Sequence, residues 1–146
     1  MEENKVTEHK YKKQFDVWFE LWKQRVRSGF KDFLCTGRVY FINKHVRPFL
    51  IDEMKWMEGQ DFKFYYANND SKFDKDFMEL NKSWGDKNIR LVIISPKVTV
   101  GCNCDQADIF DEIFIYATPL SVVIRVILQM MARIRKPKSN GTFIYF

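Results

Sequence analysis

The sequence predicts an α/β domain in which a mainly parallel sheet is covered by helices on both faces. Two runs, residues 89–95 and 113–117, are apolar almost throughout, which is typical of strands buried on both faces of a parallel sheet. Residues 15–26 instead repeat apolar side chains at intervals of three and four, the pattern of an amphipathic helix. Because strands alternate with helices along the chain, we expect parallel pairing and about five or six strands.

The chain has the size and composition of one folded domain. It contains 146 residues, of which 46% are hydrophobic and 16% aromatic, and this excludes an intrinsically disordered protein. We predict a single domain over residues 1–146, with a helical lead-in at 1–29 and the core at 30–146. A net charge of +5 is compatible with a polyanionic partner but does not establish one.

The remaining elements follow from local patterns. We interpret the aromatic stripe within residues 15–26 as core packing and not as a surface for stacking bases. The other predicted strands are 39–42, 62–67 and 142–146, and the other predicted helices are 46–57, 73–80 with an end near Gly85, and 118–135.

The cysteines indicate a reducing setting. Cys35, Cys102 and Cys104 are odd in number, and no secretory signal precedes them, so we expect an intracellular compartment and no disulfide framework. Cys102 and Cys104 lack the second ligand pair that structural zinc sites use, so we expect no metal site. No apolar run approaches the roughly 20 residues of a membrane span, and we expect no membrane partner.

A hydroxyl residue ends the first apolar run, six positions before a glycine. Ser95, Gly101 and Asn103 resemble motif V of superfamily 2 helicases, T-x-x-x-x-x-G-x-D, with Asn103 in place of the acid. The resemblance implies that Ser95, together with Lys97 and Thr99, contacts the nucleic-acid backbone. It also implies that Gly101 and Asn103 face the nucleotide. Taken alone, the same residues would only end a strand and make a turn.

A second pattern lies on the predicted helix near the C-terminus. Gln129 and Arg133 resemble motif VI, Q-x-x-G-R-x-x-R, with Ala132 at the glycine and Lys136 at the second arginine. The resemblance implies that Gln129 and Lys136 bind nucleotide and that either Arg133 or Arg135 is an arginine finger, because a guanidinium stabilises charge on a transferring phosphoryl group. The alternative is a solvated basic helix end that complements the helix dipole.

The order of the motifs extends the resemblance over residues 30–146. Residues 41–44 resemble motif IV, which adds Asn43 to the predicted nucleic-acid contacts. The family implies a three-layer RecA-like domain, the second lobe of an ATP-dependent helicase. Residues 92–101 look most like viral replication-origin-binding helicases. That resemblance implies that the partner is DNA, as a single strand or a fork, with RNA as the alternative. It also implies a viral replication site in the host cytoplasm or nucleus.

The phosphate-binding half of such an enzyme is missing from the sequence. No glycine is followed by lysine, so the P-loop that cradles phosphates is absent. We therefore expect ATP and Mg²⁺ to be held mainly by a P-loop lobe in trans or in a longer gene product, and no ATP hydrolysis by the chain alone. Residues 50–53 and 109–112 only superficially resemble a magnesium motif, and we expect Asp52 and Glu53 to face solvent.

A second function class stays open. The chain could be a non-enzymatic or truncated α/β module that binds nucleic acid or a protein partner. A P-loop reading frame directly upstream would favour the helicase lobe. Free replacement of Arg133 and Arg135 would favour the binding module.

Overall fold

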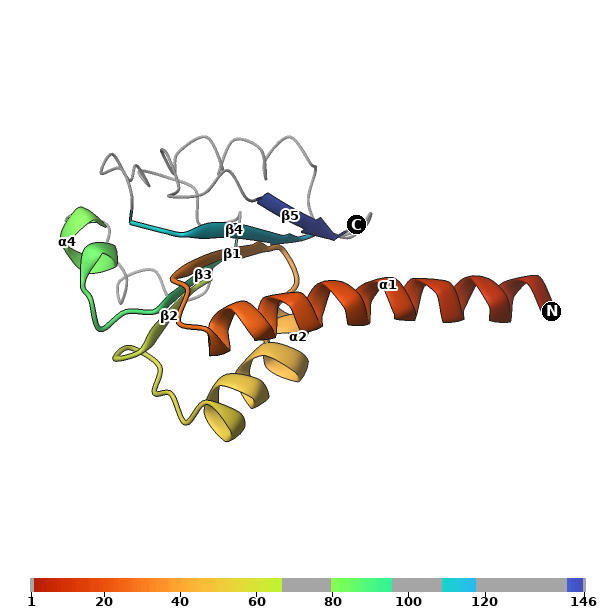
Figure 1. The fold of residues 1–146 in the computed structure, drawn as a ribbon, viewed down its shortest axis with the longest axis horizontal. Coiled ribbons are helices and arrows are strands. Elements are labelled where there is room, and N and C mark those ends of the chain that lie inside the picture. Colours follow the sequence, from red (N-terminus) through yellow and green to blue (C-terminus); the bar gives the residue numbers. More distant parts are fainter. Residues whose placement is uncertain (1, 67–79, 96–108, 118–141, 146) are drawn as a thin grey trace.

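Among the described residues, five strands form one sheet in which all neighbouring strands run parallel (Figure 1). In this computed structural model the described residues are 2–66, 80–95, 109–117 and 142–145. The strands are β1 (Asp32–Thr36), β2 (Phe62–Tyr65), β3 (Leu91–Ile94), β4 (Glu112–Tyr116) and β5 (Thr142–Tyr145). The predicted α/β class with a parallel sheet is confirmed.

Strand β1 occupies the centre of the sheet, whose order is β2-β3-β1-β4-β5. From β1 the chain passes to the edge strand β2 and returns to β3, which pairs with β1 in the register Phe33↔Val92. It then crosses to the other side of β1, where β4 pairs in the register Phe33↔Ile113 and β5 follows. The strand order therefore changes direction at β1. In open α/β sheets, ligands bind beyond the carboxyl ends of the strands at such a switch point.

Helices cover one face of the sheet in two segments. Helix α1 (Glu2–Arg27) runs antiparallel to the strands, and its amino-terminal part extends past their carboxyl ends (Figure 1). The second segment follows β1 and consists of α2 (Val39–Phe41), η1 (Ile42–Val46) and η2 (Phe49–Glu53). On the opposite face, the short helix α4 (Leu80–Gly85) contributes the buried Trp84.

Alternate residues of the strands supply two separate cores. On the α1 face, Leu34 and Phe114 belong to a cluster with the fully buried Trp22. On the opposite face, Phe33 and Trp84 belong to a second cluster. Successive side chains of a strand point to opposite faces. Since an apolar cluster covers each face of this sheet, the strands appear in the sequence as continuous apolar runs. The apolar stripe predicted within residues 15–26 lies on α1 and packs into the core. Its buried residues are Trp18, Phe19, Trp22 and Val26.

Near β1 one sequence expectation is wrong and one strand was not predicted. Residues 39–42 are not a strand but the start of the helical segment, and the strand is Asp32–Thr36, which the sequence did not predict. The β-prone side chains are overridden by tertiary packing, because Ile42, Val46 and Leu50 recur every four residues and are all fully buried in the α1-side core. In a helix, side chains four residues apart lie on the same face, so all three reach the α1-side core.

The helical segment after β1 has wide turns. The Met54 N–H donates to the Phe49 carbonyl at 3.1 Å, five residues back, and the Arg47 N–H donates to the Ile42 carbonyl in the same spacing. Pro48 lies between these turns, has no N–H to donate, and its ring would meet the carbonyl four residues earlier. The wider turns accommodate that ring within a continuous helical path. The predicted helix 46–57 ends earlier than expected, at Glu53, and Lys55 follows in the left-handed region at φ 59°.

The other predicted strands are confirmed as β2, β3, β4 and β5, with β3 and β4 flanking the central strand. The predicted helix 118–135 and most of the predicted helix 73–80 lie outside the described residues. Within the described part of the chain, no helix is both long enough and apolar enough to cross a membrane.

Candidate functional site

The carboxyl edge of the sheet is the candidate site, because the strand order changes direction there. The sheet is prolonged at this edge by backbone hydrogen bonds from Ser95 N–H to the Tyr65 carbonyl at 3.0 Å and from Ala117 N–H to the Tyr145 carbonyl at 2.8 Å. After β1, the Thr36 hydroxyl accepts the Arg38 N–H at 3.2 Å. This bond closes the turn that leads from the central strand into the helical segment.

Ser95 lies where the sequence placed it, directly after β3 at this edge. Its side chain is only 3% exposed, and its N–H is already bonded to the neighbouring strand. The structure therefore fixes the position of Ser95 at the carboxyl end of β3. Contact between the Ser95 hydroxyl and a nucleic-acid phosphate stays a prediction.

Most of the other predicted site residues lie outside the described part of the chain. These are Lys97, Thr99, Gly101, Asn103, Gln129, Arg133, Arg135 and Lys136. Their roles stay predictions. Residues 95 and 117 are the last described positions before the two stretches that contain these residues, and both lie at the carboxyl edge of the sheet.

Asn43, the remaining predicted contact, is exposed on η1. The predicted strand 39–42 would have placed Asn43 just after a strand, and the structure places it on a helix instead. Tyr40 and Lys44 lie within one turn of it, and the Lys44 Nζ is 5.3 Å from the centre of the Tyr40 ring. Sequence reasoning missed both residues, although aromatic and basic side chains lie close together in the sequence from Arg38 to Lys44.

An aromatic layer lies beneath this edge, on the α1 side of the sheet. Phe41 stacks on Tyr116 with ring centres 4.1 Å apart at 9°, and Tyr116 stacks on Tyr145 at 5.3 Å and 14°. Phe15 of α1 packs edge-on against all three rings. Burial raises the pKa of Tyr116, and the nearby Arg38 guanidinium opposes that rise. The layer packs the start of the helical segment against the ends of β4 and β5.

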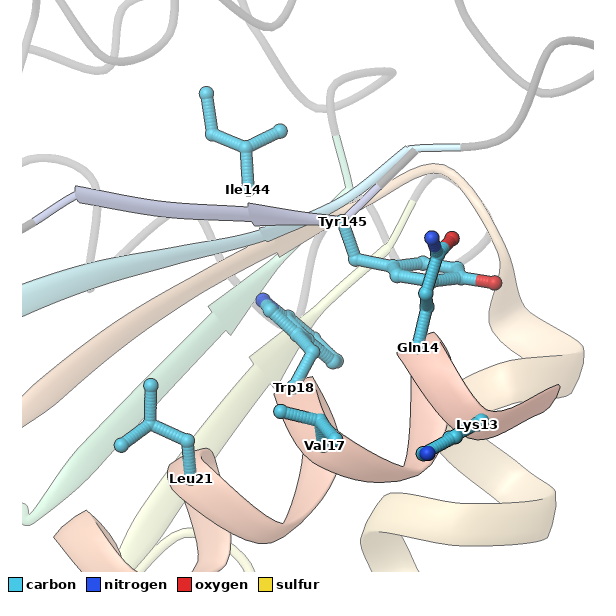
Figure 2. Close-up of a pocket in the computed structure, with 7 residues that line it drawn as sticks. All are labelled: Lys13, Gln14, Val17, Trp18, Leu21, Ile144 and Tyr145. Atoms are coloured by element: carbon cyan, nitrogen blue, oxygen red, sulfur yellow. The ribbon is translucent and has the colours of Figure 1, made fainter. Parts of the chain in front are cut away.

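A groove of about 760 Å³ runs between α1 and β5 (Figure 2). Its lining is mostly apolar, with these residues: Lys13, Gln14, Val17, Trp18, Leu21, Ile144 and Tyr145. In Figure 2 the Tyr145 ring points toward α1, while Ile144 points to the other side of the sheet. The lining has no cluster of ionisable groups, so the groove is a weaker candidate than the carboxyl edge for binding a charged ligand.

The two acidic runs that superficially resemble a magnesium motif lie away from the carboxyl edge. Asp52 and Glu53 are exposed, as expected, and Glu53 pairs with Arg27 at 2.6 Å. Asp111 accepts the Lys31 N–H at 2.7 Å and, with Glu112, lies at the amino end of β4. Within the described ranges, no group of three or more His, Cys, Asp or Glu side chains could hold a metal ion.

Comparison with known proteins identifies the fold. No protein-family model matches the sequence, and no curated protein sequence matches it significantly. One similar solved structure is Mss116p DEAD-box helicase domain 2 bound to an RNA duplex, with a TM-score of 0.58 and 12% identity over 89% of this chain and 47% of that chain. Another is the C-terminal part of the Fun30 ATPase domain, with a TM-score of 0.53 and 15% identity over 88% of this chain and 39% of that chain.

This chain thus spans less than half the length of either solved chain. At such identities the likeness concerns the fold. The parallel sheet and its helices have the RecA-like α/β architecture that these two structures share.

Proposed function

We propose that this chain is the second RecA-like lobe of an ATP-dependent nucleic-acid helicase. The observation that carries the proposal is the coincidence of two independent features at one edge. The fold is similar to the second domain of a DEAD-box helicase and to part of an ATPase domain. In that fold, Ser95, the first residue of the motif V resemblance, directly follows β3 at the carboxyl edge.

In this proposal the lobe completes a nucleotide site that another lobe begins. A P-loop lobe, in trans or in a longer gene product, holds ATP and Mg²⁺. Arg133 or Arg135 stabilises the charge that develops on the transferring phosphoryl group. Gly101, Asn103, Gln129 and Lys136 lie against the nucleotide. Since the sequence contains no P-loop, the chain alone hydrolyses no ATP.

The nucleic acid lies along the same edge. Ser95, Lys97 and Thr99 contact its backbone from the stretch that follows β3, and Asn43 contacts it from η1. One similar structure is a helicase domain bound to an RNA duplex, which supports a nucleic-acid partner. More specifically, we propose a DNA helicase of the viral replication-origin-binding type, and this assignment rests on the resemblance of residues 92–101. Its substrate would then be single-stranded or forked DNA.

The absence of a P-loop also supports a second candidate, a non-enzymatic module that binds nucleic acid or a protein partner. The two candidates differ in what happens when a P-loop lobe is added. A helicase lobe raises ATP turnover of that partner, and a binding module leaves it unchanged.

Salt-dependent binding of the purified chain to labelled single strands and forks tests the proposal. Backbone contacts release condensed counterions, so affinity should fall as salt rises, with a slope that reports the number of phosphates contacted. Absence of binding at low salt, or binding that ignores salt, would overturn the proposal. Robust ATP turnover by the chain alone would contradict the division of labour between the two lobes.

A further inference from the structure

Tyr40 is the most exposed large hydrophobic or aromatic side chain in the part of the chain that the structure describes. It is 68% exposed, whereas its neighbour Phe41 is 3% exposed. A buried aromatic ring stabilises a fold in proportion to the apolar area it removes from water, and Tyr40 removes little. The Tyr40 ring therefore contributes little to the buried core.

The backbone that carries Tyr40 is held firmly. It lies in the first turn of α2, just after the bond between the Thr36 hydroxyl and the Arg38 N–H. The next residue, Phe41, stacks on Tyr116 of β4 at 4.1 Å. The turn is thus fixed to the central strand and its neighbour at the switch point of the sheet. A ring presented from such a turn loses little conformational freedom when it binds.

The surroundings of the ring are basic. The Lys44 Nζ is 5.3 Å from the ring centre, and Arg38 precedes Tyr40 by two residues. No acidic residue occurs between Thr36 and Leu50. An exposed aromatic ring beside cations, with no carboxylate in the same segment, favours a polyanion with flat rings over an apolar protein partner.

From this arrangement we infer that the Tyr40 ring stacks on a base of single-stranded nucleic acid while the Lys44 ammonium contacts an adjacent phosphate. The inference rests on the proposed function and adds a base contact to it. The residues proposed above need only the backbone of the strand. Stacking accepts any base, because every base has a π face, so it adds affinity without requiring a particular sequence.

The test compares a strand that has bases with one that lacks them. Fluorescein-labelled oligothymidylate, oligouridylate and an abasic DNA strand of the same length are titrated with the full chain, and anisotropy gives each affinity. The wild-type chain should prefer the strands that carry bases. Tyr40→Ala should weaken binding to both of those strands by roughly 5- to 100-fold and leave binding to the abasic strand unchanged.

Three variants sharpen this comparison. Tyr40→Phe keeps the ring and should bind like the wild type. Lys44→Ala should weaken binding to all three strands and reduce the salt slope by about one. Met57→Ala is the matched control, because Met57 is also an exposed apolar side chain, at 59%, but lies in the turn before β2. It should change none of the affinities.

The outcomes separate this inference from the proposed function. If the wild type binds all three strands equally and Tyr40→Ala changes nothing, the stacking contact is wrong while backbone binding stands. If the wild type binds no strand at low salt, both fail. An unfolded Tyr40→Ala would show as a lost thermal transition, and the comparison of Tyr40→Phe with Tyr40→Leu on the base-bearing strands then decides the matter.

Discussion

Asp32 and Glu112 lie directly opposite each other on β1 and β4, and both are buried, at 0% and 4% exposed. Neither Asp32 carboxyl oxygen has a hydrogen-bond partner among the described residues. The Glu112 Oε1 lies 3.6 Å from the Arg25 Nε of α1. The pKa of Asp32 is raised to about 8, mainly by burial and then by the neighbouring Glu112 and Asp111 carboxyls, while the Arg25 guanidinium opposes the rise. Asp32 is therefore protonated in the fold at neutral pH.

Replacing this carboxyl should change how stability depends on pH. The folded pKa of Asp32, about 8, exceeds its ordinary value of 3.8, so the folded state binds the proton more tightly than the unfolded state. The protonated Asp32 carboxyl contributes to the free energy of unfolding fully below about pH 4, and this contribution is lost as pH rises to about 8. Over that range the free energy of unfolding falls by up to about 1.4 kcal/mol per pH unit. Asp32→Asn should remove that part of the slope, as measured by urea unfolding across this range.

The control for the Asp32 experiment is Asp52→Asn, which removes one exposed carboxyl from η2. It separates the loss of a buried proton site from the loss of one negative charge. Parallel curves of unfolding free energy against pH for the wild type and Asp32→Asn would contradict the protonated state of Asp32.

Trp22 anchors α1 to the sheet and should dominate the stability of that contact. It is fully buried, and its indole N–H has no partner in the described structure. Trp22→Ala should destabilise the fold by about 3–5 kcal/mol through the cavity it leaves. Trp22→Phe should cost less than about 2 kcal/mol, because it also removes a buried donor that has no acceptor. Urea unfolding measures both, with Val17→Ala as the exposed control on the same helix.

The stacked pair Phe41 and Tyr116 should couple the helical segment to β4. Their rings lie 4.1 Å apart at 9°, and stacked aromatic pairs contribute about 0.5–1.5 kcal/mol beyond their buried area. A double-mutant cycle with Phe41→Leu and Tyr116→Leu should therefore give a coupling free energy in that range. Strictly additive effects on unfolding would show that the stack contributes only buried area.

The arginines decide between the two candidate functions. Ala at the finger, Arg133 or Arg135, should lower the ATP turnover of the chain paired with its P-loop lobe by roughly 10³- to 10⁵-fold and leave folding nearly intact. Lys at that position should rescue only partly, because an ammonium lacks the forked donor geometry of a guanidinium. If neither Ala variant changes turnover, the helicase-lobe proposal is wrong and the binding module replaces it.

Ser95→Ala should act on nucleic-acid binding and not on basal turnover. The hydroxyl is proposed to contact the strand backbone, and its side chain is only 3% exposed. We expect weaker binding and weaker stimulation of turnover by nucleic acid, both measured on the paired lobes. Unchanged binding would assign Ser95 only the structural role that its N–H bond to the Tyr65 carbonyl already gives it.

The sequence determined the fold class because parallel strands and amphipathic helices leave strong local patterns. Residues 89–95 and 113–117 are apolar on both faces, and the structure places β3 and β4 there, on either side of the central strand. The stripe of α1 has helical spacing, and its large side chains are core. These patterns also placed Ser95 at the carboxyl edge, although they did not show that it is buried.

Tertiary structure alone decided the centre of the sheet and the segment after it. β1 begins with an ionisable residue, Asp32, and no local sequence pattern predicts its burial between two other strands. Residues 39–42 prefer strands by propensity, and that preference is worth at most about 1 kcal/mol per residue. Burying a side chain such as Ile42 contributes about 1.5–3 kcal/mol. Packing therefore outweighs propensity, and the resulting helix brings Tyr40, Asn43 and Lys44 together at the carboxyl edge of the sheet.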